Sequence, residues 1–381
     1  MTGNFKIRAC TLNCKGLRNK WKRLSIFKTL KGRKLDIICL QEAHINRKDI
    51  RVWGKQWGGQ IFYNEGSNRS KGEVILVSKH MLGERELIHN EDRIIVIKIE
   101  YQNKPTYIIN AYAPNEADEK KRFYGKVKNI IDRYNADNII LCGDFNCVAS
   151  NKLDIITGNP HNEEVIAHFL KMSDSLTDAW RYMHGEDKDY TWSRPNPFIA
   201  RRLDYCFISQ DLLNSCVSVE HMCIPSSDHK AVIMELNDND FKRGPGYWRF
   251  NNSLLKQTEF VNKMNNKLEE LTEEYANNPA KIQTWELVKV EIRNLSIDFG
   301  KHLACNRRNE EINLRGKLRE VEQQLIREPE KEQYQTTLVT LKKKLEIIEL
   351  EKAKGAQCRS RTKWIEEAEK NTSYFCSFVE K

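Results

Sequence analysis

The chain has 381 residues, 40% of them hydrophobic and 30% charged, which predicts a folded protein with more than one structural unit. It contains no apolar run of about 18 residues, and its first residues, MTGNFKIRACTLN, lack the pattern of a secretion signal, so neither a membrane span nor secretion is expected. The net charge of +10 is compatible with a polyanionic partner but is small for this length. The eleven cysteines lie mostly in apolar runs without zinc-type spacing, which favours reduced, buried thiols in an intracellular protein.

Short β-rich runs alternate with turns and a few helices up to about Leu236. Apolar residues at helical spacing predict helices at Lys20–Lys31 and Glu119–Tyr134. Strands interleaved with helices at this size predict a layered α/β arrangement with two sheets packed face to face. The predicted strands are Lys6–Leu12, Ile37–Leu40, Ile61–Tyr63, Val74–Ser78, Ile94–Glu100, Thr106–Ala111, Ile139–Cys142, Leu203–Ile208 and Ala231–Leu236.

The pattern changes near residue 240, where Gly244, Pro245 and Gly246 mark a linker. Further on, apolar residues recur at heptad spacing from Leu314 to Leu325 and again from Tyr334 to Ile348, on either side of Pro329. This pattern predicts two long helices folded into an antiparallel hairpin. We therefore expect an α/β domain at residues 1–238, a linker at 239–253 and a helical region at 254–381.

One stretch, NIILCGDFNCVAS, raises the question of function, because an apolar strand is followed by Gly143, Asp144 and Asn146. Side chains two residues apart in an extended chain point the same way, so Asp144 and Asn146 could contact one group. Gly143 permits a turn or a close backbone approach. Taken alone, the stretch fits an ordinary turn as well as it fits a functional site.

Other predicted strands also end in polar residues, which favours the functional reading. If these ends converge, they form a cleft rich in hard oxygen ligands, which suits Mg²⁺ better than zinc. Such a site is suited to the attack of water on a phosphate ester. The residues at or near these six strand ends are Asn13, Glu42, Tyr112, Asp144 with Asn146, Asp204, and Ser227 with Asp228 and His229.

The motifs LNCKGLR, LQE, NAYAPN, GDFN, RRLDY and SDHKAV occur in the order, and at roughly the intervals, of the endonuclease/exonuclease/phosphatase superfamily, which includes apurinic/apyrimidinic endonucleases. YTW, GPGYWRFNNSLL and RTKWIEEAEKNTSYF extend the likeness to LINE-type (non-LTR) retrotransposon polyproteins, specifically their endonuclease domain and the region that follows it. The resemblance implies a four-layer α/β-sandwich, with two mixed sheets flanked by helices, as a nuclease domain at 1–238. It implies that residues 254–381 connect to a reverse transcriptase absent from this chain, because no Tyr-x-Asp-Asp signature appears.

The resemblance also implies a divalent metal site. Glu42 would be the principal Mg²⁺ ligand, Asn13 and Asp228 would assist through water, and Mn²⁺ would be tolerated. One departure concerns Lys15, which stands where relatives carry Asp or Asn near the metal. An ammonium cannot ligate Mg²⁺ and would contact phosphate instead, so metal-binding details and rate are open at this position.

The catalytic roles are carried over from the same motifs. Asp144 would orient or deprotonate the attacking water, and Asn146 would hold that water or a phosphate oxygen. His229 would contact the phosphate, with Asp204 fixing its tautomer and favouring its charge. Tyr112 would donate a hydrogen bond to the phosphate or leaving oxygen, although a strand tyrosine is by default a packing residue. Further substrate contacts are expected from Thr191, Ser227, Arg202 and Lys15.

The function implied is the nicking of one strand of duplex DNA to leave a 3′-hydroxyl that primes reverse transcription of the element's RNA. Partners would be target DNA, element RNA and the reverse transcriptase region, with a monomeric nuclease domain and no membrane. Action would be nuclear after cytoplasmic ribonucleoprotein assembly. Two alternatives remain: a weak or inactive nuclease fold that binds nucleic acid or protein, and a general apurinic/apyrimidinic endonuclease.

The basic residues near the end of the chain have two readings. They could grip nucleic acid beside the polymerase, or they could be the solvated face of a helical connector whose acids nearly balance its bases. The nucleic-acid-binding candidates in this region are Lys352, Lys354, Arg359, Arg361 and Lys363.

Overall fold

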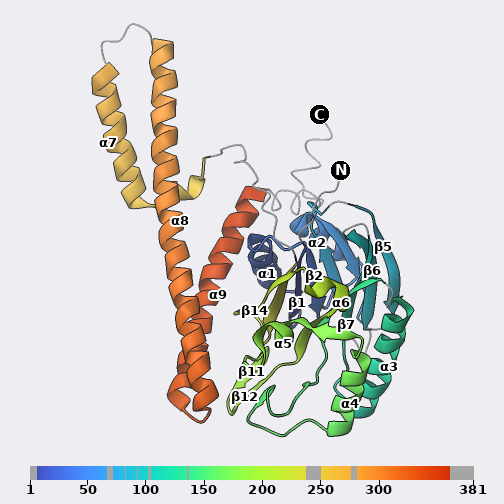
Figure 1. Cartoon of the computed structure of the whole chain (residues 1–381). Helices are drawn as coiled ribbons and strands as arrows, with labels where there is room; N and C mark the ends of the chain where they lie inside the picture. Colours follow the sequence, from blue (N-terminus) through green and yellow to red (C-terminus); the bar gives the residue numbers. More distant parts are fainter. Residues whose placement is uncertain are drawn as a thin grey trace. The chain divides into compact units, whose positions relative to one another are not determined.

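Two β-sheets of six strands each form the centre of the N-terminal fold (Figure 1). The structure is a computed structural model that describes residues 7–66, 72–81, 83–91, 93–101, 104–134, 137–236, 250–275 and 281–360. The described residues divide into one compact unit within 1–239 and 320–381 and a second within 240–319.

The first sheet has the strand order β14-β15-β1-β2-β4-β3. β1 and β2 are parallel and the other neighbours are antiparallel, so the sheet is mixed. Its central strands are almost wholly buried because they are covered on both faces. The strands are β1 (Ile7–Asn13), β2 (Ile37–Gln41), β3 (Gln60–Tyr63), β4 (Val74–Val77), β14 (Cys216–Cys223) and β15 (Lys230–Leu236).

The second sheet has the order β10-β13-β8-β7-β6-β5 and is also mixed, with β7 and β8 parallel. Isoleucines from both sheets meet between them, among them Ile37, Ile75, Ile97, Ile108 and Ile140. A small third sheet has the order β11-β12-β9. The remaining strands are β5 (Arg85–Glu91), β6 (Ile94–Tyr101), β7 (Lys104–Tyr112), β8 (Asn138–Asp144), β9 (Ile155–Ile156), β10 (Leu176–Asp178), β11 (Trp192–Pro195), β12 (Phe198–Arg201) and β13 (Asp204–Ser209).

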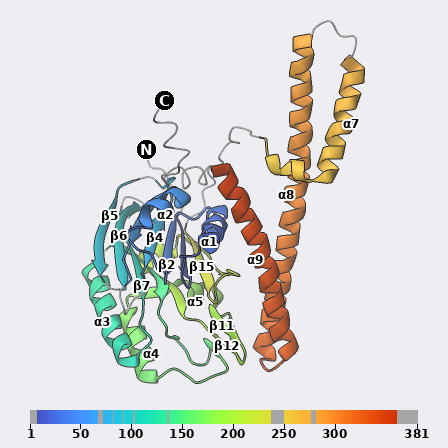
Figure 2. The same ribbon diagram turned by 180° about the vertical axis from the view of Figure 1, so that it is seen from behind.

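Helices cover the outer face of each large sheet (Figure 2). Phe27 of α1 and Trp53 of α2 pack on the first sheet, and Phe123 of α3 and Phe169 of α4 pack on the second. The predicted four-layer α/β-sandwich is therefore confirmed. The helices are α1 (Lys20–Gly32), α2 (Ile50–Trp57), α3 (Ala117–Tyr134), α4 (Glu163–Met172), α5 (Ala179–His184) and α6 (Gln210–Leu213).

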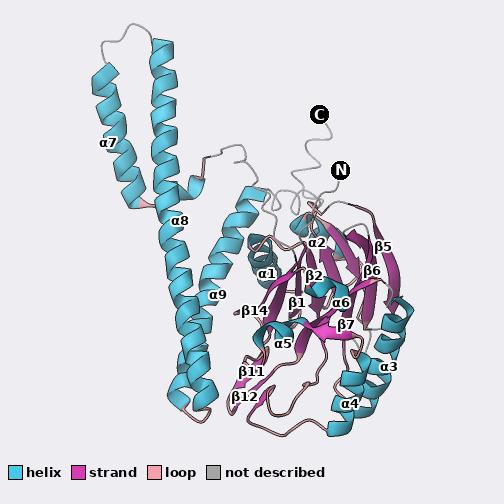
Figure 3. Ribbon diagram, viewed as in Figure 1, coloured by secondary structure: helices cyan, strands magenta, loops and turns pink. Residues whose placement is uncertain are grey.

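The C-terminal part is helical, as predicted (Figure 3). The second unit contains a short 3₁₀ helix (Asn252–Lys256), α7 (Thr258–Tyr275) and most of α8 (Lys281–Arg327). In the first unit, the last turns of α8 and the helix α9 (Glu332–Ser360) run antiparallel on either side of Pro329, which confirms the predicted hairpin. None of the helices in the described ranges has the length and hydropathy needed to span a bilayer.

The strand β8 ends later than the sequence predicted, and the difference concerns Gly143. β8 does not stop before Gly143 but continues through Asp144, paired with both β7 and β13. A Cβ atom at Gly143 would lie 1.9 Å from the Ala111 carbonyl oxygen. Glycine is therefore needed for the close approach of β7 rather than for a turn.

Candidate active site

The polar strand ends predicted from the sequence come from both sheets and meet at one edge of the sandwich. β1 and β2 are parallel, as are β7 and β8, so the carboxyl ends within each pair lie side by side. Asp144 is in register with Tyr112 on β7 and with Asp204 on β13. Asn13 ends β1, which places it at the same edge. Its side-chain amide lies 2.9 Å from Asp144 Oδ2, which joins the two sheets.

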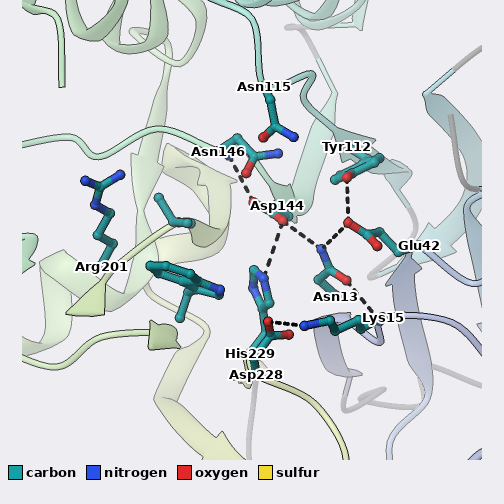
Figure 4. Close-up of a pocket in the computed structure, with 12 residues that line it drawn as sticks. Asn13, Lys15, Glu42, Tyr112, Asn115, Asp144, Asn146, Arg201, Asp228 and His229 are labelled. Atoms are coloured by element: carbon teal, nitrogen blue, oxygen red, sulfur yellow. Dashed lines mark hydrogen bonds and ion pairs between the residues drawn. The ribbon is translucent and has the colours of Figure 1, made fainter. Parts of the chain in front are cut away.

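A pocket with a cavity volume of about 330 Å³ opens at this edge (Figure 4). Carboxylates, amides and basic side chains line it, which gives a polar cleft suited to a charged substrate. The lining residues are Asn13, Lys15, Glu42, Tyr112, Asn115, Asp144, Asn146, Trp192, Arg201, Leu203, Asp228 and His229.

Asn13 and Tyr112 hold the two carboxylates on one side of the pocket. Asn13 Nδ2 donates to Asp144 Oδ2 at 2.9 Å and lies 3.4 Å from Glu42 Oε1. The Tyr112 hydroxyl donates to the same Glu42 oxygen at 2.7 Å. Burial and this hydrogen bond to Glu42 raise the pKa of Tyr112 far above its usual value, so it remains a donor. The network fixes the position of the Glu42 carboxylate.

His229 lies between two buried aspartates. Its Nδ1 is 2.8 Å from Asp204 Oδ2, and its Nε2 is 3.9 Å from Asp144 Oδ2. Burial disfavours the imidazolium, but Asp204, Asp144 and Asp228 outweigh it and raise the pKa of His229 to about 9. Burial and the Asp204 charge raise the pKa of Asp144 to about 7. The site thus pairs a charged histidine with a carboxyl that titrates near neutral pH.

Several residues at the pocket adopt left-handed backbone conformations. The φ angle is 47° at Lys15, 51° at Glu42 and 48° at Asn146. Such conformations cost about 1–3 kcal/mol each in residues other than glycine and concentrate at functional sites. Hydrogen bonds stabilise them, because the Gly16 amide donates to Glu42 O at 2.7 Å and the Asn146 amide to Asp144 Oδ1 at 2.9 Å.

Lys15, the departure from the family pattern, forms an ion pair. Its Nζ is 2.7 Å from Asp228 Oδ2, and both side chains are partly exposed. Burial opposes ionisation of Asp228, but Lys15 and His229 outweigh it and lower its pKa. Asp228 is therefore a charged group that already has a cationic partner inside the pocket.

The donor set fits a hard divalent cation. Carboxylate oxygens of Asp144 and Asp204 lie within 4.8 Å of each other beside the His229 ring, and in the described part of the chain Asp204 Oδ1 is buried without a hydrogen-bond partner. Glu42 adds a third carboxylate, linked to Asp144 through Asn13. Oxygen-rich sites of this kind favour Mg²⁺ or Mn²⁺ over softer metals.

Four of the predicted site residues lie behind the pocket and do not line it. Asp204 is buried and supports His229. The Ser227 hydroxyl donates to Asn13 O at 2.7 Å and accepts from the His229 amide at 3.1 Å. The Thr191 hydroxyl accepts the amides of Leu203 and Asp204, at 2.9 and 3.1 Å. These contacts position the strand ends that carry the catalytic candidates.

Arg202 is the fourth of these residues, and the structure does not bring it to the substrate side. Its guanidinium is 1% exposed and is held by Asp154 at 2.8 Å and Asp178 at 2.6 Å. The preceding residue, Arg201, lines the pocket instead. Adjacent side chains on an extended chain face opposite ways, so the basic pair RR alone does not indicate which arginine is available.

Sequence reasoning did not select Asn115 or Leu203 as site residues, it considered Arg201 only as a basic residue beside Asp204 that could contact a nucleic-acid backbone, and it treated Trp192 mainly as a core residue. All four line the pocket. All four lie within motifs already singled out, Asn115 in NAYAPN, Trp192 in YTW, and Arg201 with Leu203 in RRLDY, so membership of those motifs was the available signal.

The tail candidates are only partly described. Lys352 and Lys354 lie on α9, and Lys354 Nζ is 5.7 Å from the centre of the Trp21 ring on α1. Arg359 falls within the α9 backbone, whereas Arg361 and Lys363 lie outside the described residues. Their role in binding nucleic acid stays a prediction.

Comparisons with known proteins agree with this arrangement. The chain is similar to the Transposon TX1 uncharacterized 149 kDa protein of Xenopus laevis, with 25% identity over 97% of this chain and 29% of the relative. The chain thus spans less than a third of that relative's length. The predicted likeness to transposon-encoded proteins is confirmed.

Solved structures show the same fold. AP endonuclease LMAP from Leishmania major has a TM-score of 0.53 and 16% identity, covering 61% of this chain and 88% of that chain. The 3′ phosphatase NExo from Neisseria, bound to product DNA hairpin, has a TM-score of 0.50 and 18% identity, covering 61% and 99%. At these identities the likeness concerns the fold alone. The model of the Endonuclease/Exonuclease/phosphatase family matches residues 10–229, which is more than half of the chain, and the chain therefore belongs to that family.

Proposed function

We propose that this chain is a metal-dependent nuclease that nicks one strand of duplex DNA and leaves a 3′-hydroxyl. The observation that carries the proposal is the convergence of Glu42, Asp144 and His229, from three separate strand ends, in one polar pocket. Two carboxylates and a charged imidazole are the groups that hydrolysis of a phosphodiester requires.

Asp144 would orient the attacking water and accept its proton. Its pKa of about 7 is close to the pH at which a general base is most effective. Asn13 and the Asn146 amide hold its two oxygens, which fixes the carboxylate. Asn146 Nδ2 donates to Ala113 O at 2.8 Å, which leaves the Asn146 amide oxygen to bind the water.

His229 would donate its Nε2 proton to a phosphate oxygen, because Asp204 binds Nδ1 and keeps the ring charged. Tyr112 orients Glu42 through its hydroxyl and would donate to the phosphate once substrate displaces that bond. Lys15 lies on the same side of the pocket and could exchange its exposed pair with Asp228 for a phosphate oxygen.

The metal would be held principally by Glu42, with Asn13 and Asp228 contributing through water. A bound Mg²⁺ or Mn²⁺ would supply a positive charge that stabilises the developing negative charge on the phosphate oxygens. Tyr112 and Asn13 keep the Glu42 carboxylate oriented for this role.

The transposon relative supports duplex DNA as the substrate and priming of reverse transcription of an element RNA as the purpose of the nick. A DNA-bound structure with the same fold also supports nucleic acid. In the polyprotein we expect a reverse transcriptase region to use the 3′-hydroxyl. The nicking step would then occur where chromosomal DNA is available, in the nucleus.

The first test is relaxation of a supercoiled plasmid with Mg²⁺. Wild-type chain should nick the plasmid, whereas Asp144→Ala and His229→Ala should leave it supercoiled. Asp211→Ala is the control, because that carboxylate is exposed and, in the described ranges, forms an ion pair with Lys104 alone. Equal nicking by all variants would show that the activity does not come from this pocket.

A second test examines the 3′ end that is left, the preference for an abasic site and the dependence on metal. Nicks mapped at nucleotide resolution should carry 3′ ends that a DNA polymerase extends, and an abasic duplex should not be cut preferentially. Mg²⁺ should raise the melting temperature of wild type by mass action and should not raise that of Glu42→Gln. Preferential cutting at the abasic site would instead favour a repair-type endonuclease.

A further inference from the structure

A second group of basic side chains lies on the far side of the pocket from Glu42 and Lys15. Figure 4 shows Arg201 on one side and Lys15 on the other, with Asp144 and His229 between them. Lys120 lies near Arg201, because its Nζ donates to Asn146 O at 2.6 Å and because both cations are close enough to His161 to lower the pKa of that ring. The catalytic centre therefore has basic side chains on both flanks.

Lys120 differs from its neighbour on α3 in how its charge is balanced. Lys121 Nζ is 2.7 Å from Glu164 and 3.6 Å from Asp118, so Lys121 forms ordinary surface ion pairs. Lys120 forms no ion pair within the described part of the chain. Burial lowers the pKa of Lys120, although Cys147, Asp144 and Glu116 act in the opposite direction. An ammonium has thus been partly removed from water without a carboxylate partner.

Arg201, at the end of β12, is in the same situation. Its Nη2 donates to Asn159 O at 2.9 Å, and its Nη1 is 3.1 Å from His161 Nε2. Its Nε is buried and has no hydrogen-bond partner among the residues that the structure describes. Among the described residues, no carboxylate forms an ion pair with Arg201.

His161 cannot compensate for this charge. Burial, Arg201 and Lys120 lower the pKa of His161 to about 4, so its ring is neutral and accepts from Arg201. Asn151 holds His161 in place, because its side chain accepts the His161 amide at 2.8 Å and donates to the His161 carbonyl at 3.0 Å. These contacts fix His161 in a position that orients the Arg201 guanidinium.

We propose that Lys120 and Arg201 form a subsite for a phosphate that flanks the scissile phosphate on the cleaved strand. The inference rests on the proposed function, because it assumes that a nucleic acid strand crosses the pocket. Two partly buried cations without acidic partners are costly in the free protein, and a phosphodiester would supply the missing negative charge. Arginine offers a planar fork for phosphate and lysine a point charge, which suits one anion bound between them.

The first test is the salt dependence of duplex binding, measured by fluorescence anisotropy with the full chain and no divalent metal. The slope of log K against log salt is negative, and each lost phosphate contact reduces its magnitude by about 0.9. We expect that decrease for Lys120→Gln and Arg201→Gln, together with about tenfold weaker binding. Lys121→Gln, the matched control, should keep the wild-type slope, and Arg201→Lys should keep most of it because the charge remains.

The second test locates the contact on the DNA. Single phosphates around the mapped nick are replaced one at a time by neutral methylphosphonates. At one flanking position the replacement should weaken wild type and Lys121→Gln but cause no further loss in Lys120→Gln or Arg201→Gln. Additive losses at every position, or unchanged salt slopes, would overturn the subsite.

Binding needs no hydrolysis, so the salt-dependence test does not depend on the nicking reaction. A chain that binds duplex with the expected slopes but never nicks would retain the subsite and lose the proposed nuclease function. A chain that nicks normally while the variants keep the wild-type slope would retain the function and lose the subsite.

Discussion

Replacement of Arg202 by methionine should destabilise the nuclease fold. The buried guanidinium makes hydrogen bonds of 2.8 and 3.3 Å to Asp154 and one of 2.6 Å to Asp178, and it stacks 4.3 Å from the centre of the Tyr205 ring. Breaking a buried ion pair costs about 3–5 kcal/mol, because it leaves a carboxylate without its partner. Asp154 keeps Arg181 at 2.6 Å, so we expect a loss near the lower end, about 3 kcal/mol.

That loss corresponds to a decrease of about 6–12 °C in melting temperature for a domain of this size. Differential scanning calorimetry of the full chain should show it in Arg202→Met, with the salt slope of DNA binding unchanged. Arg201→Met should instead reduce the salt dependence of DNA binding and leave the free energy of unfolding within about 0.5 kcal/mol of wild type. An Arg202→Met variant that melts like wild type but binds DNA more weakly would instead show that Arg202 contacts the substrate directly.

Two further perturbations follow from single contacts. Asp189 accepts from Lys230 at 2.8 Å, and although burial opposes it, this partner lowers the Asp189 pKa. The stabilisation by ionised Asp189 is therefore fully present above its unfolded pKa of about 3.9 and is lost as the pH falls below that value. In a plot of melting temperature against pH, Asp189→Asn should therefore show a smaller decrease at acid pH than wild type, which we call a flatter acid limb. Gly143→Ala would place a Cβ 1.9 Å from the Ala111 oxygen and should destabilise by about 3 kcal/mol or more, whereas Gly125→Ala, on an open face of α3, should stabilise slightly in the same calorimetric assay. An unchanged acid limb, or a Gly143→Ala variant as stable as wild type, would contradict these contacts.

The strands that could be predicted from the sequence are those with buried, apolar runs. Each predicted strand overlaps an observed one, because strands covered on both faces are rich in Ile, Val and Leu. The short strands β9, β10, β11 and β12 were missed, and so were the longer β5 and β14. β5 and β14 both lie at sheet edges, and their sequences, RELIHNE and CVSVEHMC, carry polar residues where a central strand would be apolar. Edge strands often carry exposed, charged side chains, which prevent pairing with another chain, so the hydrophobic pattern alone does not reveal them.

The candidate site was predictable where it coincides with strand ends, because parallel strands bring their carboxyl ends to one edge. Glu42 and Asp144 follow this rule, whereas His229 directly precedes β15, which runs antiparallel to β1 and so begins at the same edge; all three line the pocket. Of the two flanking cations, Arg201 was considered only as a basic residue beside Asp204, and Lys120 was not found. Lys120 lies on a helix, and its proximity to Asn146 depends on how α3 packs on the second sheet, which local pattern does not encode.

Asp144 and Asn146 show how a correct pairing can arise from a different backbone geometry. We expected both side chains to point the same way because residues two apart share a face of an extended strand. In the structure β8 ends at Asp144, and Asn146 has a φ of 48° with its amide bonded to Asp144 Oδ1. A turn of this kind also brings residue i+2 back beside residue i, and asparagine tolerates the left-handed conformation better than most residues. The identity of Asn146 therefore serves the backbone as well as the chemistry, and a substitution there changes both the amide oxygen in the pocket and the hydrogen bond that orients Asp144.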